Sequence, residues 1–244
     1  MSFINEEEKD KDKENGVISL LINDTYKSIS CYDYDVKKEH LTLKAKDFSP
    51  LWITNSTFYS INHNTKKQYY LGSDTDNNII VFRQNSNPKS EDDKYKIEKL
   101  CFFNFGERVN KFRKHTKELK SSEKRVKFTS LNDKVNYSTF ATVEGTIGIV
   151  IELNRQDFEF LNILQHEIIK HLANIGEFSY MKYRAFKDGF ISEESKGFID
   201  GNVLNEFILA SEETRMSIFQ NLNYAWARTL KDTILMIEML TSFH

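Results

Sequence analysis

The residues of this sequence whose chemistry could support catalysis or metal binding are two histidines, one aspartate and two cysteines. His166 and His171 are five residues apart in a stretch with helical spacing, so they lie on different faces and do not suit a metal site. Asp200 precedes a helical stretch, and we expect it to turn the chain or cap that helix. Cys31 and Cys101 lie in separate strand-like stretches, which indicates neither a disulfide framework nor a zinc site. Gly-rich phosphate loops and Ser or Cys nucleophile motifs are also missing, so we expect a protein that is not an enzyme and needs no cofactor.

A basic stretch from Lys111 to Lys127 is the strongest candidate for contact with nucleic acid. It holds eight Lys and Arg residues against Glu118 and Glu123. One interpretation is a phosphate-binding patch, because lysine and arginine neutralise the phosphate backbone. The other, which we favour, is a solvated loop between two strands, since Phe112 is its one aromatic residue for stacking on bases. We therefore expect contact with nucleic acid to be indirect or weak.

Composition and charge exclude several other classes. The chain has 244 residues and a formal net charge of −2, so no global field favours nucleic acid or a membrane. No apolar run approaches the roughly 20 residues of a membrane span, and the start of the sequence lacks the apolar segment of a signal peptide. The lack of a signal-peptide segment and the two separated cysteines together favour a reducing compartment. Residues 1–16 mix acidic and basic side chains densely, which predicts a disordered N-terminal segment.

Residues 17–153 carry a repeated β pattern. Three hairpins each join two apolar strands through a few turn-forming residues. Outer strands are expected after the first two hairpins, and inner strands before the last two. The hairpins span 17–32, 69–82 and 137–153, the outer strands 40–46 and 98–105, and the inner strands 52–61 and 108–114. Three, four and then three strands in this order are typical of successive β-propeller blades.

The number of blades is too small for a complete propeller. Fewer than three full blades cannot close a ring, and they would leave sheet edges and blade faces bare. We therefore expect the last blades of an incomplete propeller. The rest of the ring would come from the remainder of a longer chain or from a separate chain.

The hydrophobic period changes at Asn154. From there, apolar residues recur every three or four positions, which predicts a helix with Phe158, Leu161, Leu164 and Ile168 on its buried face. Asn154 is itself a good N-cap residue. Further helical patterns follow, so we expect an all-α domain over 154–244. The predicted fold class is thus β-propeller blades (all-β, an incomplete propeller) followed by an all-α C-terminal helical domain.

Two segments carry family-specific motifs. Residues 197–208 read GFIDGNVLNEFI, and residues 140–149 read FATVEGTIGI. The first resembles the signature that opens the C-terminal helices of the cleavage and polyadenylation specificity factor A-subunit family, and the second resembles the last blade of that family. The family has a damaged-DNA-binding, a polyadenylation and a splicing branch. The segments most similar to the first branch are 46–53, 105–112, 197–201 and 240–244, and the resemblance covers about 17–244.

This resemblance implies a non-enzymatic adaptor. The damaged-DNA-binding branch links a cullin-RING ubiquitin ligase to substrate receptors, with roles in DNA repair and protein ubiquitination in the nucleus and cytoplasm. WD40-type receptors insert a helical segment into a cleft between the first and third of its three propellers. This chain resembles only the end of the third propeller and the helices after it, so the cullin would bind through a missing part of the full-length protein. The other two branches imply the alternative, a scaffold subunit of an RNA-processing complex that contacts RNA or RNA-binding partners.

The resemblance also implies a partner-binding site. Trp52, Asn110 and Val143 match positions of the receptor-binding cleft and lie in inner-strand and hairpin segments of successive blades. Arg108 departs from the family, in which an apolar residue is usual, and implies a more acidic partner helix. Trp52 has a second interpretation, because a tryptophan beside Pro50 at the start of a strand also suits the core of a blade. The sequence leaves both interpretations of Trp52 open.

Overall fold

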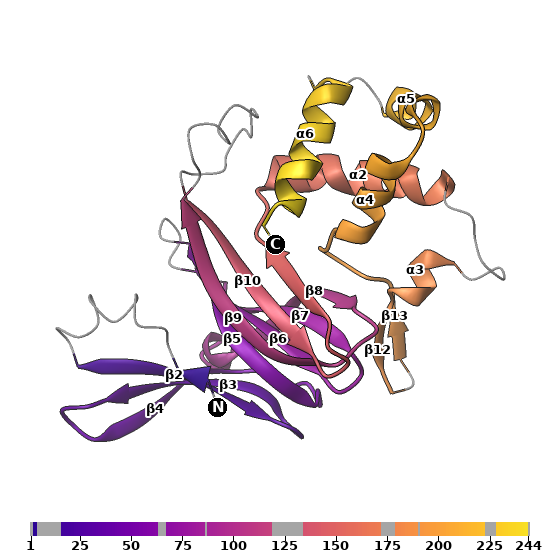
Figure 1. Cartoon of the computed structure of the whole chain (residues 1–244). Helices are drawn as coiled ribbons and strands as arrows, with labels where there is room; N and C mark the ends of the chain where they lie inside the picture. The colour runs from indigo at the N-terminus through magenta and orange to yellow at the C-terminus, as the bar shows by residue number, and fades with distance from the viewer. Residues whose placement is uncertain are drawn as a thin grey trace. The chain divides into compact units, whose positions relative to one another are not determined.

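A computed structural model of the chain describes residues 2–3, 16–62, 67–85, 87–118, 134–171, 179–189, 191–222 and 228–243 (Figure 1). The chain divides into two compact units, and each is described by itself. The first unit comprises Met1–Lys114, Ser138–Gly148 and Met181–Gly197. The second comprises His115–Tyr137, Ile149–Tyr180 and Phe198–His244.

The first unit contains two four-stranded antiparallel sheets in which each strand pairs with the next along the chain. The first sheet consists of β1 (Ser2–Phe3), β2 (Val17–Asp24), β3 (Ser28–Asp35) and β4 (His40–Lys46). The second consists of β5 (Ile53–Asn62), β6 (Lys67–Asp74), β7 (Asn78–Gln84) and β8 (Ile97–Asn104), with the 3₁₀ helix η2 (Asp92–Tyr95) before β8. The expected hairpins, outer strands and inner strand of this region are confirmed.

A three-stranded sheet follows along the chain, in the order β11-β10-β9. Its strands are β9 (Val109–Glu118), β10 (Lys134–Thr142) and β11 (Ile147–Ile151), which confirms the expected inner strand and last hairpin. The boundary between the two units passes through all three strands. Most of the basic stretch, residues 119–127, lies outside the described residues. The chain is therefore a series of antiparallel sheets followed by helices, and the described strands do not form a closed ring.

The N-terminal segment 1–16, which was expected to be disordered, has defined structure at its two ends. Ser2 and Phe3 form β1 and pair with Leu21 and Leu20 of β2, and Gly16 occupies a turn at φ +67°. Residues 4–15, which carry the charged stretch, lie outside the described residues.

The core of the first unit consists of inward-facing residues from its two four-stranded sheets. Leu21, Ile29 and Cys31 contribute from the first sheet, and Tyr70 and Phe82 from the second, all of them fully buried. Side chains alternate between the two faces of a strand, so each sheet covers the apolar face of the other. Burial raises the pKa of the Cys31 thiol, and it also raises the pKa of the Tyr70 phenol. These two groups are therefore neutral parts of the core.

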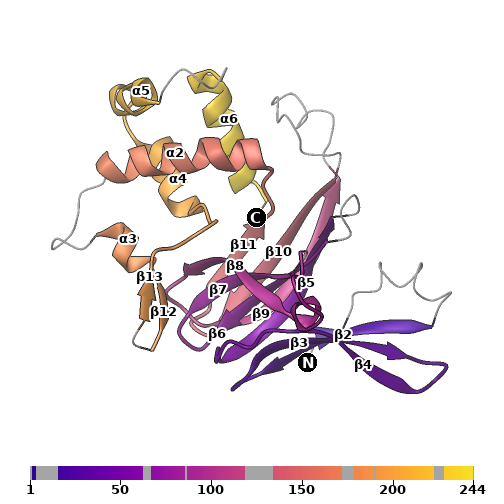
Figure 2. The ribbon, with the colours of Figure 1, turned by 180° about the vertical axis from the view of Figure 1, so that it is seen from behind.

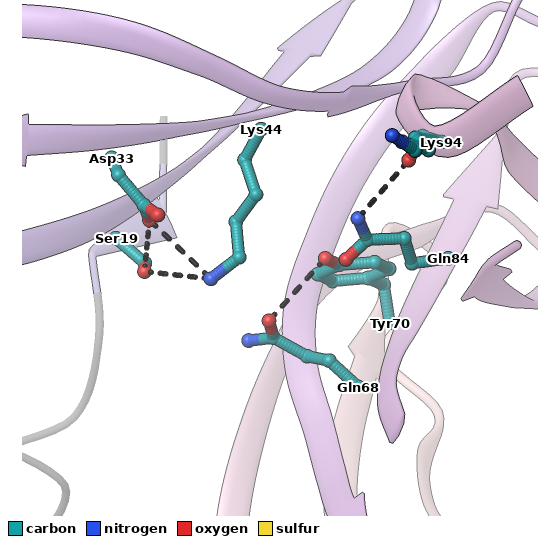
Figure 3. Close-up of polar contacts among 7 residues, drawn as sticks. All are labelled: Ser19, Asp33, Lys44, Gln68, Tyr70, Gln84 and Lys94. Carbon is teal, nitrogen blue, oxygen red and sulfur yellow. Dashed lines mark hydrogen bonds and ion pairs between the residues drawn. The ribbon is translucent and has the colours of Figure 1, made fainter. Parts of the chain in front are cut away.

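Polar contacts connect neighbouring strands at the surface of the first unit (Figure 3). The Ser19 hydroxyl donates to Asp33 Oδ1 at 2.5 Å, and Lys44 Nζ lies 3.4 Å from the same carboxylate oxygen, so one residue from each of β2, β3 and β4 takes part. The Lys44 and Asp33 side chains are 32% and 33% exposed, so this pair contributes little, about 0–1 kcal/mol. The Gln84 amide donates to the Lys94 carbonyl at 3.3 Å and connects β7 to η2.

A short hairpin returns the chain to the first unit after the first long helix. It consists of β12 (Phe186–Asp188) and β13 (Ile191–Glu193), preceded by α3 (Tyr180–Tyr183). Phe186 is 2% exposed and its ring lies 5.2 Å from that of Phe102, while Lys196 exchanges two backbone hydrogen bonds of 2.9 Å with Phe102. Gly197 is required next to this contact, because a Cβ there would lie 2.4 Å from the Cys101 sulfur. Residues 154–244 are therefore not all helical, which corrects the expected all-α domain.

The second unit contains four helices longer than one turn within the described residues, α2 (Arg155–His171), α4 (Gly201–Leu209), α5 (Glu212–Asn221) and α6 (Leu230–Thr241) (Figure 2). Each begins at a side-chain cap. Asn154 accepts from the Asp157 N–H at 2.8 Å at the start of α2, and the N-caps of the other three are Asp200, Ser211 and Thr229. None of the described helices has the length and apolar character to span a membrane.

The helices of the second unit share one apolar core. Leu161, Leu164 and Ile168 of α2 are buried in it, as expected, together with residues of α4, α5 and α6. Phe158 is only half-buried, and Phe160 is buried in its place, which corrects one position of the predicted face. The buried arc of α2 is centred on Leu161, Leu164 and Ile168, so Phe158 lies at its edge.

Candidate protein-binding site

Three hairpin turns of the first unit have the same local chemistry. In each, the last residue of the first strand uses a side-chain oxygen to accept a backbone N–H two or four residues later, and the two bonds that span two residues are those of Asx turns. The bonds are Asp24 to Tyr26 at 2.8 Å, Asp74 to Asp76 at 3.0 Å and Thr142 to Thr146 at 2.9 Å. Each of the three turns is thus held at its start by a side chain of the preceding strand.

Contacts between successive turns join three of the four predicted site residues, Trp52, Arg108 and Val143, into one series. The Tyr26 ring lies edge-on to the Trp52 ring, with centroids 5.9 Å apart. The Trp52 carbonyl accepts from the Thr75 N–H at 3.1 Å, and the Thr75 carbonyl accepts from Arg108 Nη2 at 3.3 Å. The Arg108 carbonyl in turn accepts from the Val143 N–H at 2.9 Å. Trp52, Arg108 and Val143, which are up to 91 residues apart in the sequence, are thus connected in space.

This series is exposed. Tyr26, Trp52 and Val143 are 73%, 53% and 65% exposed, and Arg108 and Asn110 are exposed as well. The interpretation of Trp52 as a core residue is therefore wrong. Val109, between the two exposed polar residues, is buried, so Arg108 and Asn110 lie on the same side of the chain. We call the set Tyr26, Trp52, Thr75, Arg108, Asn110 and Val143 the hairpin-turn face.

Sequence reasoning missed two members of the hairpin-turn face. Tyr26 extends the apolar surface of Trp52, and Thr75 supplies the backbone that connects Trp52 to Arg108. A large aromatic residue in a short polar turn was a usable signal for Tyr26, because turns usually hold small or polar residues. No signal marks Thr75, since its contribution depends on backbone atoms.

Two acidic groups near the turns have shifted pKa values. Hydrogen bonds from the hydroxyls of Thr146 and Thr142 lower the pKa of Glu107, which is bonded to Thr142 Oγ1 at 2.7 Å. Burial raises the pKa of Asp74 to about 6, although its carboxylate accepts hydrogen bonds from Asn78 N at 2.9 Å, Asn78 Nδ2 at 2.7 Å and Asp76 N at 3.0 Å. Asp74 thus titrates in a range where other carboxyls have already lost their protons.

The titration of Asp74 predicts a pH dependence of stability. Between about pH 4 and pH 6 the folded chain keeps a proton on Asp74 that the unfolded chain has released, so stability falls as the pH rises through this range. The pKa difference corresponds to a loss of about 3 kcal/mol. We expect Asp74→Asn to remove this loss, as measured by denaturant unfolding of both proteins from pH 4 to pH 7.5. Acids common to both proteins cancel in the comparison, and parallel pH profiles of the two proteins would contradict the assignment.

The residues considered for catalysis have structural contacts. His166 and His171 are exposed on α2. Nδ1 of His166 lies 2.7 Å from the Asn162 carbonyl, and Nδ1 of His171 lies 2.9 Å from the Glu167 carbonyl. Asp200 caps α4 by accepting from the Asn202 N–H at 2.9 Å. Within the described residues, no group of three or more His, Cys, Asp and Glu side chains is arranged to hold a metal ion.

Comparison with known proteins identifies the family. The family model described as "CPSF A subunit region" matches residues 13–209, which is most of the chain. DNA damage-binding protein 1 of Drosophila melanogaster is 26% identical over 230 residues, covering 92% of this chain and 19% of the relative. DNA damage-binding protein 1a of Arabidopsis thaliana is 23% identical over 225 residues, with the same shares covered. The chain spans about a fifth of the length of these relatives.

These matches confirm the resemblance to the large subunit of the UV-damaged-DNA-binding complex. The matched range includes strands β2 to β13, the hairpin-turn face and the helices α2, α3 and α4. The chain therefore belongs to the CPSF A subunit family.

Proposed function

We propose that this chain is the receptor-binding end of a non-enzymatic adaptor of the damaged-DNA-binding type. In this role it would link substrate receptors to a cullin-RING ubiquitin ligase, in DNA repair and protein ubiquitination in the nucleus and cytoplasm. The observation that carries the proposal is the hairpin-turn face, which joins Trp52, Arg108 and Val143 on an exposed surface. The relatives named for DNA damage binding support it.

The proposed architecture is the end of a β-propeller. The sheets β1–β4, β5–β8 and β9–β11 would be successive blades, because each is an antiparallel series in chain order. In a propeller the turns between equivalent strands of successive blades lie on one face of the ring. The hairpin-turn face would then belong to that face and line the cleft into which a receptor inserts a segment.

The proposed partner is a WD40-type receptor that binds through a helical segment. Trp52 and Tyr26 offer aromatic surface for the apolar side of such a helix. Arg108 and Asn110 offer polar groups at its rim, and the charge of Arg108 favours an acidic helix. The cullin would bind through a part of the full-length protein outside this chain, and contact with nucleic acid would be indirect or weak.

The test is to identify what co-purifies with the endogenous full-length protein by mass spectrometry. We expect cullin and WD40-type receptors. Recovery of 3′-end-processing or spliceosomal proteins in their place would contradict the ligase assignment. The same purification after nuclease treatment separates direct protein partners from those held by nucleic acid.

The second candidate is a scaffold subunit of an RNA-processing complex. The observation that favours it is the matching family model, which is named for a polyadenylation factor subunit. In that case the basic stretch would lie near RNA. Tight binding of a structured RNA at physiological salt, lost on deletion of residues 118–125, would support this candidate.

The incomplete set of blades predicts how the isolated chain behaves. Within the described residues, strand β4 pairs along its length with β3 and is otherwise joined only by a single bridge between Lys46 and Lys96, and its Leu41 is 46% exposed. Open strand edges and bare apolar faces favour association between copies. We expect the isolated 244-residue chain to be oligomeric or poorly soluble in sedimentation velocity. A stable, cooperatively unfolding monomer would contradict an incomplete propeller.

A further inference from the structure

The turn between β6 and β7, residues 75–77, connects two members of the hairpin-turn face. The Thr75 N–H donates to the Trp52 carbonyl at 3.1 Å, and the Thr75 carbonyl accepts from Arg108 Nη2 at 3.3 Å. Both bonds use backbone atoms of Thr75, so the position of the turn determines how Trp52 and Arg108 lie relative to each other. We call residues 75–77 the Thr75 turn.

A segment from much later in the chain is bonded to the Thr75 turn. It consists of β12 and the residues beside it, residues 184–189, and belongs to the same unit as the turn. The Gly189 N–H donates to Asp76 Oδ2 at 3.4 Å across 113 residues of sequence. Asn104 connects the two as well, because its N–H donates to the Arg184 carbonyl at 3.1 Å and its Nδ2 donates to the Asp76 carbonyl at 2.9 Å. We call residues 184–189 the return segment.

Asn78 is the centre of this connection. Its Nδ2 donates to the Lys187 carbonyl at 2.6 Å and to Asp74 Oδ2 at 2.7 Å. Its Oδ1 accepts from the Lys187 N–H at 3.1 Å and from Asn104 Nδ2 at 3.0 Å. The side-chain amide thus uses both donor hydrogens and both acceptor lone pairs, and it pairs with the Lys187 backbone as a neighbouring strand would.

The same network reaches the Thr75 turn through Asp74. Asp74 Oδ1 accepts from the Asp76 N–H at 3.0 Å and from the Asn78 N–H at 2.9 Å, so the carboxylate that Asn78 holds also shapes the turn. Asp74 and Asn78 are 2% and 0% exposed. Neither side chain is open to a partner, and unpaired polar groups at this depth are costly. An effect of Asn78 on partner binding therefore passes through the residues that it holds in place.

We propose that the return segment positions the receptor-binding site. Through Asn78 and Asn104 it holds the Thr75 turn in the place where the turn joins Trp52 to Arg108. Asn78 is then a positioning residue, and a segment beyond α2 in the chain sets how well the hairpin-turn face is ordered before a partner arrives. The proposal rests on the proposed function and deepens it, because ordering Trp52 and Arg108 in advance lowers the entropy lost on binding.

Removing the Asn78 donor tests the proposal. Asn78→Asp keeps the size of the side chain and removes Nδ2, the donor to Lys187 and Asp74. The probe is the WD40-type receptor recovered in highest yield by the co-purification, titrated as a purified protein into the full-length protein. We expect about tenfold weaker binding, because Trp52 and Arg108 must then be ordered during binding. Unchanged affinity of a folded Asn78→Asp protein would overturn the proposal.

A second pair of variants acts at the return segment and avoids a buried substitution. Lys187→Pro removes the N–H that donates to Asn78, and Lys187→Gln removes the same charge but keeps that N–H. The Lys187 side chain is exposed and its backbone N–H and carbonyl are both bonded to Asn78, so proline removes no bond between β12 and β13. We expect Lys187→Pro to weaken receptor binding about threefold and Lys187→Gln to leave it unchanged. Equal effects of the two variants would contradict the positioning role, and this pair decides the question where Asn78→Asp does not fold.

Hydrogen exchange of the same full-length proteins separates positioning from a general loss of stability. We expect Asn78→Asp to speed exchange in peptides that contain the Thr75 turn and the return segment, while β3 exchanges as before. Ile97→Val is the control for stability, because Ile97 is buried in the core of the first unit and lies at the end of β8 opposite Asn104. It should leave receptor affinity unchanged. Exchange that rises equally in β3 and in the Thr75 turn of Asn78→Asp would show a purely structural role and refute positioning.

The two proposals fail in different ways. Faster local exchange in Asn78→Asp, together with no receptor capture by the unchanged protein, would contradict the proposed function while supporting the ordering of the Thr75 turn by Asn78. Receptor capture that depends on Trp52 but is the same for Asn78→Asp and Lys187→Pro would contradict the positioning role alone.

Discussion

Replacing Trp52 by alanine in the full-length protein is expected to weaken receptor binding by roughly 2–4 kcal/mol, or about 30- to 1,000-fold in Kd. Large aromatic side chains that become fully covered dominate binding at protein interfaces. Trp52 has the required exposure, 53%, and the edge contact with Tyr26 limits the orientations of its ring. Little entropy is therefore lost when a partner covers it.

The measurement is a binding titration beside a thermal unfolding curve. Because Trp52 lies outside the core, we expect the midpoint of unfolding to change little. Tyr95→Ala is a matched control, since Tyr95 is an aromatic residue of the first unit, 47% exposed and distant in sequence from the turns of the hairpin-turn face. A variant of Trp52 with unchanged affinity and reduced stability would refute its assignment as an anchor.

Replacing Leu164 by alanine is expected to destabilise the second unit by about 2–5 kcal/mol. Leu164 is fully buried in the core that α2 shares with α4, α5 and α6. Truncation removes buried apolar area and leaves a cavity, because Phe207 and Ile237, which are also fully buried, can move only partly into the space.

Denaturant unfolding measures this effect as a lower midpoint at an unchanged slope. Ile163→Ala, one residue earlier on α2, is the control, because Ile163 is 43% exposed and its truncation should change stability by less than about 1 kcal/mol. Equal stability of Leu164→Ala and the unchanged chain would mean that α2 does not contribute to a cooperative core.

Local sequence signals predicted the elements well. The three hairpins were recognised from turn residues between β-branched runs, and the same turn residues make the side-chain hydrogen bonds seen at Asp24, Asp74 and Thr142. Asn154 and Asp200 were recognised as caps, because an N-cap acts on N–H groups two or three residues away. These interactions depend on neighbours in the sequence, so the sequence contains the information.

Signals that depend on distant residues were less informative. Phe158 and Phe160 are both apolar and two positions apart, and only the partners from α4, α5 and α6 decide which of them is buried. No hairpin was expected within residues 154–244, because β12 and β13 have three residues each and leave little pattern in the sequence. They become a hairpin through the packing of Phe186 on Phe102.

The sequence by itself determined the order of the strands, the turns between them, the helix starts and the resemblance that marked Trp52, Arg108, Asn110 and Val143. The tertiary structure alone decided that Trp52 is exposed, that Thr75 and Arg108 connect it to Val143, and that Tyr183 and Lys187 lie beside the Thr75 turn. The physical reason is the range of the interactions. Turns and caps form between residues a few positions apart, whereas exposure and the position of residues 183–189 beside the turn between β6 and β7 arise from contacts between segments up to 113 residues apart.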